Sequence, residues 1–214
     1  MIVNETDNQT YTRQRAWKLL CEWTQSQSLL KHALAVETCV RAYGEREADA
    51  RNITGSERDN FVDAYSITGL LHDFDYERHP SLEEHPFVGN RLLVDQGWPE
   101  QIRTAILGHA TYSGVPRASH LAKALFACDE LAGFLTACSL VKPTKSIFDV
   151  DVTGVKKKMK DKAFARGVNR DDIVVGAVEL GVSIDDHLAF CILAMQKNAD
   201  ALGLRGTPAA DTKL

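Results

Sequence analysis

The stretch LLHDFDY, residues 70–76, places a histidine and two carboxylates directly behind an apolar run. The apolar residues before it recur at the spacing of a helix, and Ser56 and Asp59 form a capping box that is typical of a helix start. His72 and Asp73 therefore fall at the C-terminal end of a predicted helix, next to the expected core. Polar groups that can bind a metal or transfer a proton need a reason to lie there.

The remainder of the chain also has helical periodicity, and almost no segment alternates apolar and polar residues as a strand does. Serine and proline residues mark several helix starts. The predicted fold class is therefore all-α. The predicted helices are Arg13–Thr24, one from about Ser28, one from Ser56 to the His72–Asp73 pair, Pro86–Gln96, Pro99–Ala110, Ser119–Ser139 and a last one opened by Ser183.

The chain has 214 residues, of which 44% are hydrophobic, and this is enough for a real core. We expect one mainly helical domain over residues 1–141 and a helical C-terminal extension over 142–214 that packs on it, with a polar tail from about Gly203. The formal charge of −4 argues against broad electrostatic binding of nucleic acid. The lysine-rich segment 155–162 is expected to be a solvated or substrate-edge face of a helix.

No apolar run approaches the roughly 18–20 residues of a membrane span, and residues 1–15 contain no signal-like apolar segment. The five cysteines are scattered, and none forms a Cys-x-x-Cys pair. Reduced thiols in the core explain them better than disulfides or a zinc cluster. We therefore expect a cytoplasmic protein with no membrane partner, and the sequence predicts no oligomeric state.

Four more polar residues lie on other predicted helices or at their ends, namely His32, His85, His109 and Asp129. Imidazoles and carboxylates form a mixed ligand set that suits divalent metals such as Mn, Fe, Co, Ni or Zn. Ligands that point inward from several helices are a common way to build a metal site in an all-α core. One His–Asp dipeptide alone is weak evidence, because a lone histidine on an apolar face is more often a hydrogen-bonded core residue.

The order of these residues resembles the H…HD…H…H…D pattern of the HD-domain superfamily, over about residues 28–139. Every position of the pattern is filled, and the subgroup that it resembles most consists of stand-alone predicted hydrolases. The resemblance implies a helical bundle with metal-dependent phosphohydrolase activity. The matching positions are His32 in LLKHALAV, His72 and Asp73 in GLLHDFDY, His85 in EEHPFVGNRLL, His109 in AILGHATYSG and Asp129 in ALFACDELAG.

The resemblance also implies a binuclear site for two divalent metal ions, with Mn, Fe, Mg, Ni, Co and Zn as the candidates. In such a site Asp73 bridges the two ions. The first ion would be held by His32, His72, Asp73 and Asp129, and the second by Asp73, His85 and His109.

Two departures from the family pattern narrow the expected activity. Asp75 and Tyr76 stand where the family often has glycine and lysine, and no G-Y-P signature follows His109. These departures argue against a cyclic-dinucleotide phosphodiesterase.

Two metal ions a few ångströms apart can lower the pKa of a water molecule toward neutrality and hold a phosphate through its oxygens. The expected function is therefore hydrolysis of a phosphate ester or anhydride in a small, nucleotide-like substrate, by a phosphomonoesterase or a phosphodiesterase. Asp73 would take part in catalysis as the bridging ligand. Asp75 or Glu130 would protonate the leaving group, since both lie beside predicted ligands in the sequence.

A phosphate substrate also needs cations around its oxygens. The candidate substrate-binding residues lie on or beside the predicted helix that carries Asp129, and they are Arg117, Lys123, Lys142 and Lys145.

Two alternatives share this ligand order. A minority of the superfamily uses a mixed-valent di-iron centre to activate O₂, and such an oxygenase holds a hydroxylated small substrate on one iron. The second alternative is a non-catalytic metal-binding regulatory domain, although such domains usually lack one or more of the ligands.

Overall fold

The computed structural model describes residues 11–207, and over that range it contains α-helices, two short 3-10 helices and no strand. The predicted all-α class is confirmed. The α-helices are α1 (Arg13–Trp23), α2 (Gln27–Ala50), α3 (Gly55–Leu71), α4 (Phe87–Asp95), α5 (Glu100–His109), α6 (His120–Leu140), α7 (Val152–Met159), α8 (Arg170–Leu180), α9 (Ile184–Lys197) and α10 (Ala199–Leu202), and the 3-10 helices are η1 (Thr111–Ser113) and η2 (Ile147–Asp149).

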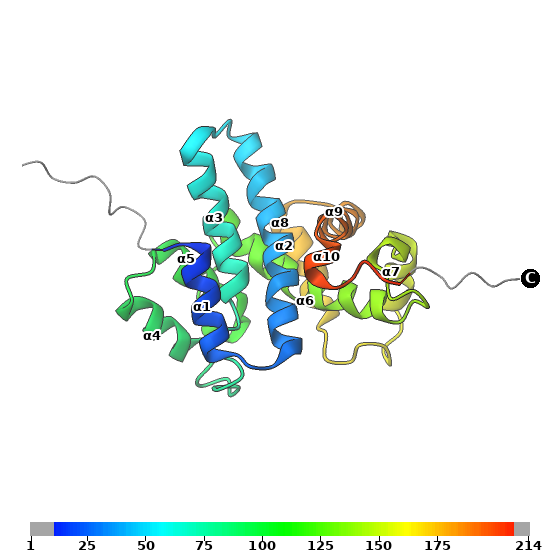
Figure 1. The fold of residues 1–214 in the computed structure, drawn as a ribbon, viewed down its shortest axis with the longest axis horizontal. Helices are drawn as coiled ribbons and strands as arrows, with labels where there is room; N and C mark the ends of the chain where they lie inside the picture. Colours follow the sequence, from blue (N-terminus) through cyan, green and yellow to red (C-terminus); the bar gives the residue numbers. More distant parts are fainter. Residues whose placement is uncertain (1–10, 208–214) are drawn as a thin grey trace, which may run out of the picture.

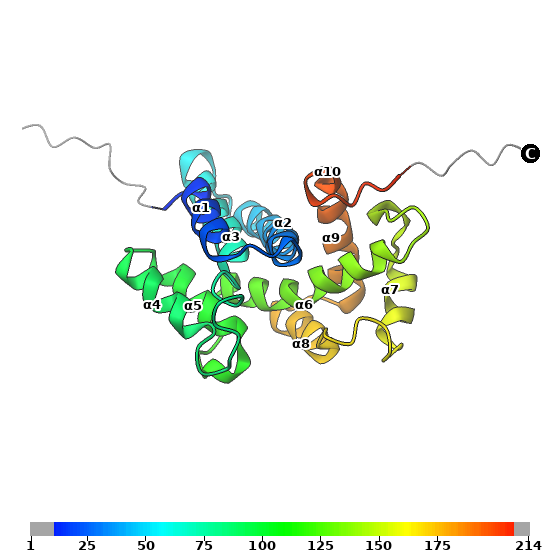
Figure 2. The same cartoon turned by 60° about the horizontal axis from the view of Figure 1, so that its bottom comes forward.

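The long helices α2 and α3 lie side by side and run in opposite directions, and α6 crosses against both (Figures 1 and 2). Gly69 allows the close approach of α3 to α2, because a Cβ atom at this position would lie 2.8 Å from the Cα atom of Glu37. Any larger residue would push the two helices apart. The C-terminal end of α3, where the His–Asp pair lies, is therefore held tightly against α2.

A buried carboxylate ties the first three helices together. Glu37 on α2 is 5% exposed, and its two oxygens accept hydrogen bonds from the guanidinium of Arg13 on α1 at 2.5 and 2.8 Å. The hydroxyl of Ser66 on α3 donates to the same carboxylate at 2.5 Å. A buried charge needs such partners, because an unpaired carboxylate in the core would be strongly destabilising.

The larger of two hydrophobic clusters runs across the expected boundary at residue 141. Leu125 and Leu135 on α6 belong to the same cluster as Ile173 on α8 and Leu188 on α9. The C-terminal helices therefore complete the core of α2 and α6 (Figure 2). The five cysteines are free thiols, and all but Cys21 are buried.

The polar tail expected from about Gly203 begins later than predicted. Leu204 is buried, and its carbonyl accepts a hydrogen bond from the Ile147 N–H at 2.9 Å. The Thr207 N–H donates to the carbonyl of Thr144. The error arose because one apolar residue in a polar stretch gives no periodic signal. The rest of the expected tail, 208–214, lies outside the described residues.

Two of the three expected serine caps are confirmed. Ser119 accepts a hydrogen bond from the Ala122 N–H, and Ser183 accepts one from the Asp186 N–H. The predicted capping box at Ser56 is wrong. The helix α3 begins at Gly55, and its N-cap, Thr54, makes no side-chain hydrogen bond. None of the helices within residues 11–207 is both long and apolar enough to cross a membrane.

A buried histidine outside the predicted ligand set joins three helices. The Tyr43 hydroxyl on α2 donates to His187 Nδ1 at 2.7 Å, and the Nε2–H of this α9 histidine donates to the carbonyl of Ala127 on α6 at 2.9 Å. Because a carbonyl can only accept, Nε2 carries a proton, and in the neutral ring Nδ1 accepts from the Tyr43 hydroxyl. Burial lowers the pKa of His187 to about 4.

This histidine should make the folded state sensitive to acid. Its pKa is lower in the folded chain than the unfolded value of about 6.5, so the unfolded chain binds the proton first as the pH falls. Stability should therefore decrease from about pH 6.5 down to about pH 4, by on the order of 3 kcal/mol from this group. Urea unfolding across this range should give a shallower pH slope for His187→Gln than for the wild type. Parallel pH profiles for the two proteins would contradict the assignment.

Candidate metal centre

The six predicted ligands come from five places in the fold. His32 lies in the second turn of α2, His72 and Asp73 follow α3, and His109 is the last residue of α5. His85 directly precedes α4 through a cis peptide bond to Pro86, and Asp129 lies in the middle of α6. The helices α2, α3, α5 and α6 pack against one another (Figures 1 and 2). The fold therefore gathers residues that are up to about 100 positions apart in the chain.

One group of possible metal ligands consists of His32, His72 and Asp129. Asp129 Oδ1 lies 3.1 Å from His32 Nε2 and 3.3 Å from His72 Nε2, and the two Nε2 atoms are 3.3 Å apart. Donor atoms that bind one ion at about 2.0–2.2 Å are themselves separated by roughly 2.8–3.6 Å in tetrahedral or octahedral geometry. The three distances therefore fit one transition-metal ion.

A second group consists of Asp73, His85 and His109. Asp73 Oδ1 lies 3.3 Å from the Nε2 atom of each histidine, and the two Nε2 atoms are 3.3 Å apart. This triangle has the same size as the first and fits a second ion by the same criterion.

Asp73 lies between the two groups. Its Oδ1 atom faces His85 and His109, while its Oδ2 atom lies 3.3 Å from His72 Nε2 and 3.9 Å from His32 Nε2. Each oxygen therefore faces a different group, which is the arrangement that a bridging carboxylate needs.

Hydrogen bonds at the far side of two rings fix how these rings face the centre. His72 Nδ1 donates to the Gly69 carbonyl at 2.8 Å, and His109 Nδ1 donates to the Ile106 carbonyl at 2.5 Å. A carbonyl only accepts, so the proton of each neutral ring lies on Nδ1 and the Nε2 lone pair is free. Nε2 atoms that face one another at 3.3 Å would repel, unless a proton or a metal ion lies between them.

The carboxylates and imidazoles of the centre each favour the charged form of the other. Burial lowers the pKa of His72, but Asp73 and Asp129 outweigh it and hold the pKa well above its usual value. Burial likewise opposes the ionisation of Asp129, but His72 and a hydrogen bond from His32 keep its pKa below the usual range. The two carboxylates are therefore negative at neutral pH and attract either protons or a cation.

The edge of the centre that reaches solvent is made by three of the ligands. The side chains of His32, Asp73 and Asp129 keep 23%, 22% and 19% of their surface exposed, whereas His72 is fully buried. One edge of the centre is therefore open to solvent.

Asp75 does not have the surroundings expected of a proton donor. It is 1% exposed, and its Oδ1 accepts a hydrogen bond from His85 Nδ1 at 2.7 Å. Its Oδ2 accepts one from the Gly89 N–H at 2.7 Å, and a Cβ at Gly89 would collide with the carboxylate. Both oxygens are engaged behind the ring, so Asp75 positions His85 and does not face a substrate.

Glu130 lies beside the centre, on the helix that carries Asp129. Its Oε2 atom accepts a hydrogen bond from the backbone N–H of Asn169, the N-cap of α8, at 3.1 Å. Burial and the neighbouring Asp129 raise the pKa of Glu130 to about 7. Its expected role as an acid stays a prediction.

The four predicted substrate-binding cations do not gather at the ligands. Arg117 forms a two-point ion pair with Glu179 at 2.6 and 2.7 Å and donates to the Gly108 carbonyl, so its guanidinium is committed to the packing of α8. Lys123 lies on α6, where its charge lowers the pKa of Glu179 after the larger effect of Arg117. Lys142 and Lys145 follow Leu140, the last residue of α6, and Leu140 lies roughly 17 Å from Asp129 along the helix axis at about 1.5 Å of rise per residue. These two lysines are too far for a small substrate held at the centre.

Two tyrosines beside the centre were not predicted as site residues. The Tyr112 hydroxyl donates to the His85 carbonyl at 3.0 Å, and the Tyr76 ring packs edge-on against the His85 ring with centroids 5.3 Å apart. Tyr112 follows His109 by one turn, on η1, but an aromatic residue in a polar loop carries no distinct signal in the sequence. Both tyrosines are exposed at the surface beside His85.

No family model matches the chain, and no curated protein and no solved structure matches it. The relation to the HD-domain superfamily thus stays a prediction from the order of the six residues.

The two groups predict how metal content responds to substitution. Replacing His85 or His109 by alanine should remove one of two ions, because the change takes a donor from the second group only. Replacing Asp73 should weaken the binding of both ions. Elemental analysis of protein purified without added metal or chelator measures the stoichiometry. His79→Ala is the matched control, since His79 pairs with Glu84 outside both groups. Two retained ions in both second-group variants would contradict the assignment.

Asp75→Asn should lower the affinity of the second group for its metal ion by about 10- to 100-fold, because the neutral amide holds the His85 ring less firmly. Titration against a competing chelator gives the affinity. Asp95→Asn at the exposed end of α4 removes the same charge away from the centre and should change nothing. Unchanged metal affinity together with lost turnover in Asp75→Asn would contradict this positioning role and support Asp75 as the proton donor.

Proposed function

We propose that the protein is a metal-dependent phosphohydrolase that acts on a small phosphorylated, nucleotide-like substrate. The observation that supports this proposal most is the pair of ligand triangles that share the Asp73 carboxylate. Two divalent cations held there would lower the pKa of water and neutralise the charge of a phosphate. A cytoplasmic location without a nucleic-acid partner belongs to the same proposal.

The protein side chains have defined tasks in this reaction. The backbone carbonyls behind His72 and His109 keep the Nε2 lone pairs directed into the centre. Asp75 does the same for His85. Asp73 keeps the two ligand groups at a fixed separation, which a two-metal phosphoryl reaction requires for the attacking and leaving oxygens.

Glu130 is the remaining candidate for protonating the leaving group, since Asp75 is engaged behind His85. It follows Asp129, which lies on the solvent-facing edge of the centre, and the Asn169 N–H fixes one of its oxygens. The other oxygen has no hydrogen bond to any described residue and can reach a substrate.

Phosphate release and O₂ uptake, measured on metal-loaded protein with a panel of nucleotides and sugar phosphates, test the proposal. Phosphate release that disappears in Asp73→Asn is the expected result. Glu130→Gln should lower turnover by roughly 10²–10⁴-fold with metal content unchanged. Glu57→Gln, at the exposed start of α3, is the control for loss of a carboxylate.

O₂ consumption with a mixed-valent di-iron signal and no phosphate release would replace the proposal by the oxygenase alternative. Two bound ions without either activity would instead support the regulatory domain.

A further inference from the structure

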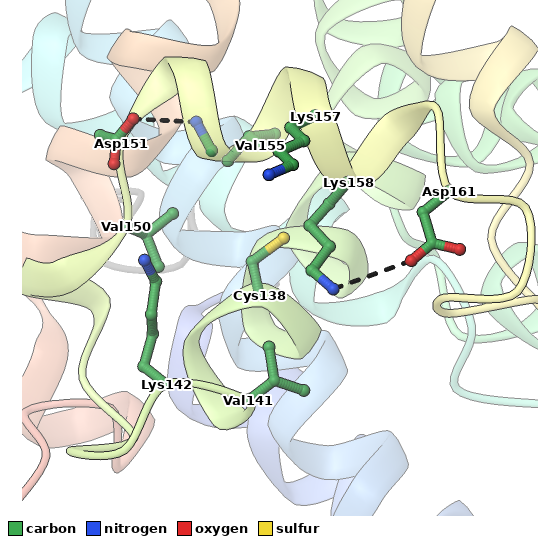
Figure 3. A pocket seen from close by; sticks show the side chains of 10 residues that line it. Cys138, Val141, Lys142, Val150, Asp151, Val155, Lys157, Lys158 and Asp161 are labelled. Atoms are coloured by element: carbon green, nitrogen blue, oxygen red, sulfur yellow. Dashed lines mark hydrogen bonds and ion pairs between the residues drawn. The ribbon is translucent and has the colours of Figure 1, made fainter.

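A second candidate site lies in the C-terminal part of the chain. The end of α6, the helix α7 and the residues directly before and after α7 line a cavity of about 440 Å³ (Figure 3). This volume is within the range of sites that bind small molecules, which is about 300–1,000 Å³. Lys142 lines the cavity together with Lys157 and Lys158 of the lysine-rich segment, and the metal centre uses none of the three.

The floor of the cavity is apolar. Cys138, Val150 and Val155 line it and are almost completely buried, and Val141 forms an exposed part of its rim. Among the residues that line it, none is aromatic and none carries a side-chain amide. Such a lining can cover an aliphatic chain but has no groups with which to stack on or pair with a nucleobase.

Three lysines surround this floor. Figure 3 shows the amines of Lys157 and Lys158 reaching in from α7, with Lys142 rising from the opposite wall. Cys138 lines the cavity with Lys142 and Lys158; burial raises the pKa of its thiol to about 11, and the charges of the two lysines oppose that rise.

The three lysine ammonium groups of the lining have few acidic partners. Within residues 11–207, the ammonium groups of Lys142 and Lys157 make no hydrogen bond or ion pair, and Lys158 faces Asp161 at 3.8 Å. The other carboxylate of the lining, Asp151, accepts the hydrogen bond of the Gly154 N–H as the N-cap of α7. The cavity therefore has two unpaired cations above an apolar floor.

The neighbouring lysines behave differently. Lys156 forms an ion pair with Asp185 on α9 at 2.7 Å, while Lys160 and Lys162 are exposed and do not line the cavity. Lys157 is exposed as well, but it and Lys158 are the lysines of the segment that line the cavity.

We propose that this cavity binds a small amphiphilic anion, with a carboxylate or phosphate head between Lys142 and Lys157 and a short aliphatic body on the apolar floor. Lysine acts as a point charge, so either kind of head group would be accepted. The site lies on the far end of α6 from the metal ligands, and the proposal does not depend on the function of the metal centre.

Isothermal titration calorimetry with the full chain at low ionic strength tests the proposal. Octanoate or octyl phosphate should bind with a stoichiometry of one and with a Kd below about 1 mM. The stronger of the two identifies the head group. Acetate and inorganic phosphate lack the aliphatic body, and 1-octanol lacks the charge, so all three should bind at least about tenfold more weakly.

Substitutions locate the binding. The double change Lys142→Gln and Lys157→Gln should weaken the preferred probe by about tenfold, the effect of losing two partly screened ion pairs. The control, Lys160→Gln with Lys162→Gln, loses the same charge and should bind as the wild type. Gly154→Leu should also weaken binding. The leucine side chain would fill part of the cavity, because Gly154 belongs to its lining. A Cβ atom at this position would lie no closer than 3.5 Å to Asp151, and leucine has a higher helix propensity than glycine, so this variant should stay folded.

Three results would overturn the proposal. Failure of both octanoate and octyl phosphate to bind would be the first, because both satisfy the proposed chemistry. Equal weakening by the two lysine pairs would show a general charge effect. Equal binding of 1-octanol and octanoate would show an apolar surface without an anion site.

Discussion

The structure depends on an electrostatic constraint at the C-terminal end of α3. The lone pairs of His72 and His109 are directed at their neighbours by carbonyls behind the rings, and two carboxylates lie among four imidazoles within contact distance. Such an arrangement is favourable only when positive charge lies between the donors, either as protons or as metal ions. The helices that carry these groups must therefore be packed tightly enough to hold them in place.

The packing around the centre provides this rigidity. Gly69 lets α3 approach α2 closely, and the same residue offers the carbonyl that holds His72. Gly89 makes room for the Asp75 carboxylate that holds His85. Gly69 thus serves both the contact between two helices and the orientation of a ligand, and Gly89 serves the orientation of a second ligand through Asp75.

The residues that could be predicted are those whose function follows from their order along amphipathic helices. The two ligand groups consist of the six histidines and aspartates whose order in the sequence resembles the H…HD…H…H…D pattern. The role of Asp75 was missed, because it depends on how the chain returns from Asp75 to His85 through residues without regular periodicity. Lys142 was expected near the centre because it follows the Asp129 helix, but an α-helix carries its last residue far from its middle.

The charge of the donor set bears on which reaction the centre can support. Four neutral histidines and two ionised aspartates carry two negative charges, so one divalent ion would leave the centre neutral and two would leave it with a charge of about +2. None of the four expected cations makes a described contact with the ligands, and Arg117 is held by Glu179. Attraction of a phosphate must then come mainly from the second ion. In the proposed hydrolase, the group of Asp73, His85 and His109 therefore decides whether a phosphorylated substrate binds, and the loss of that ion would remove phosphate binding before it disturbed the fold.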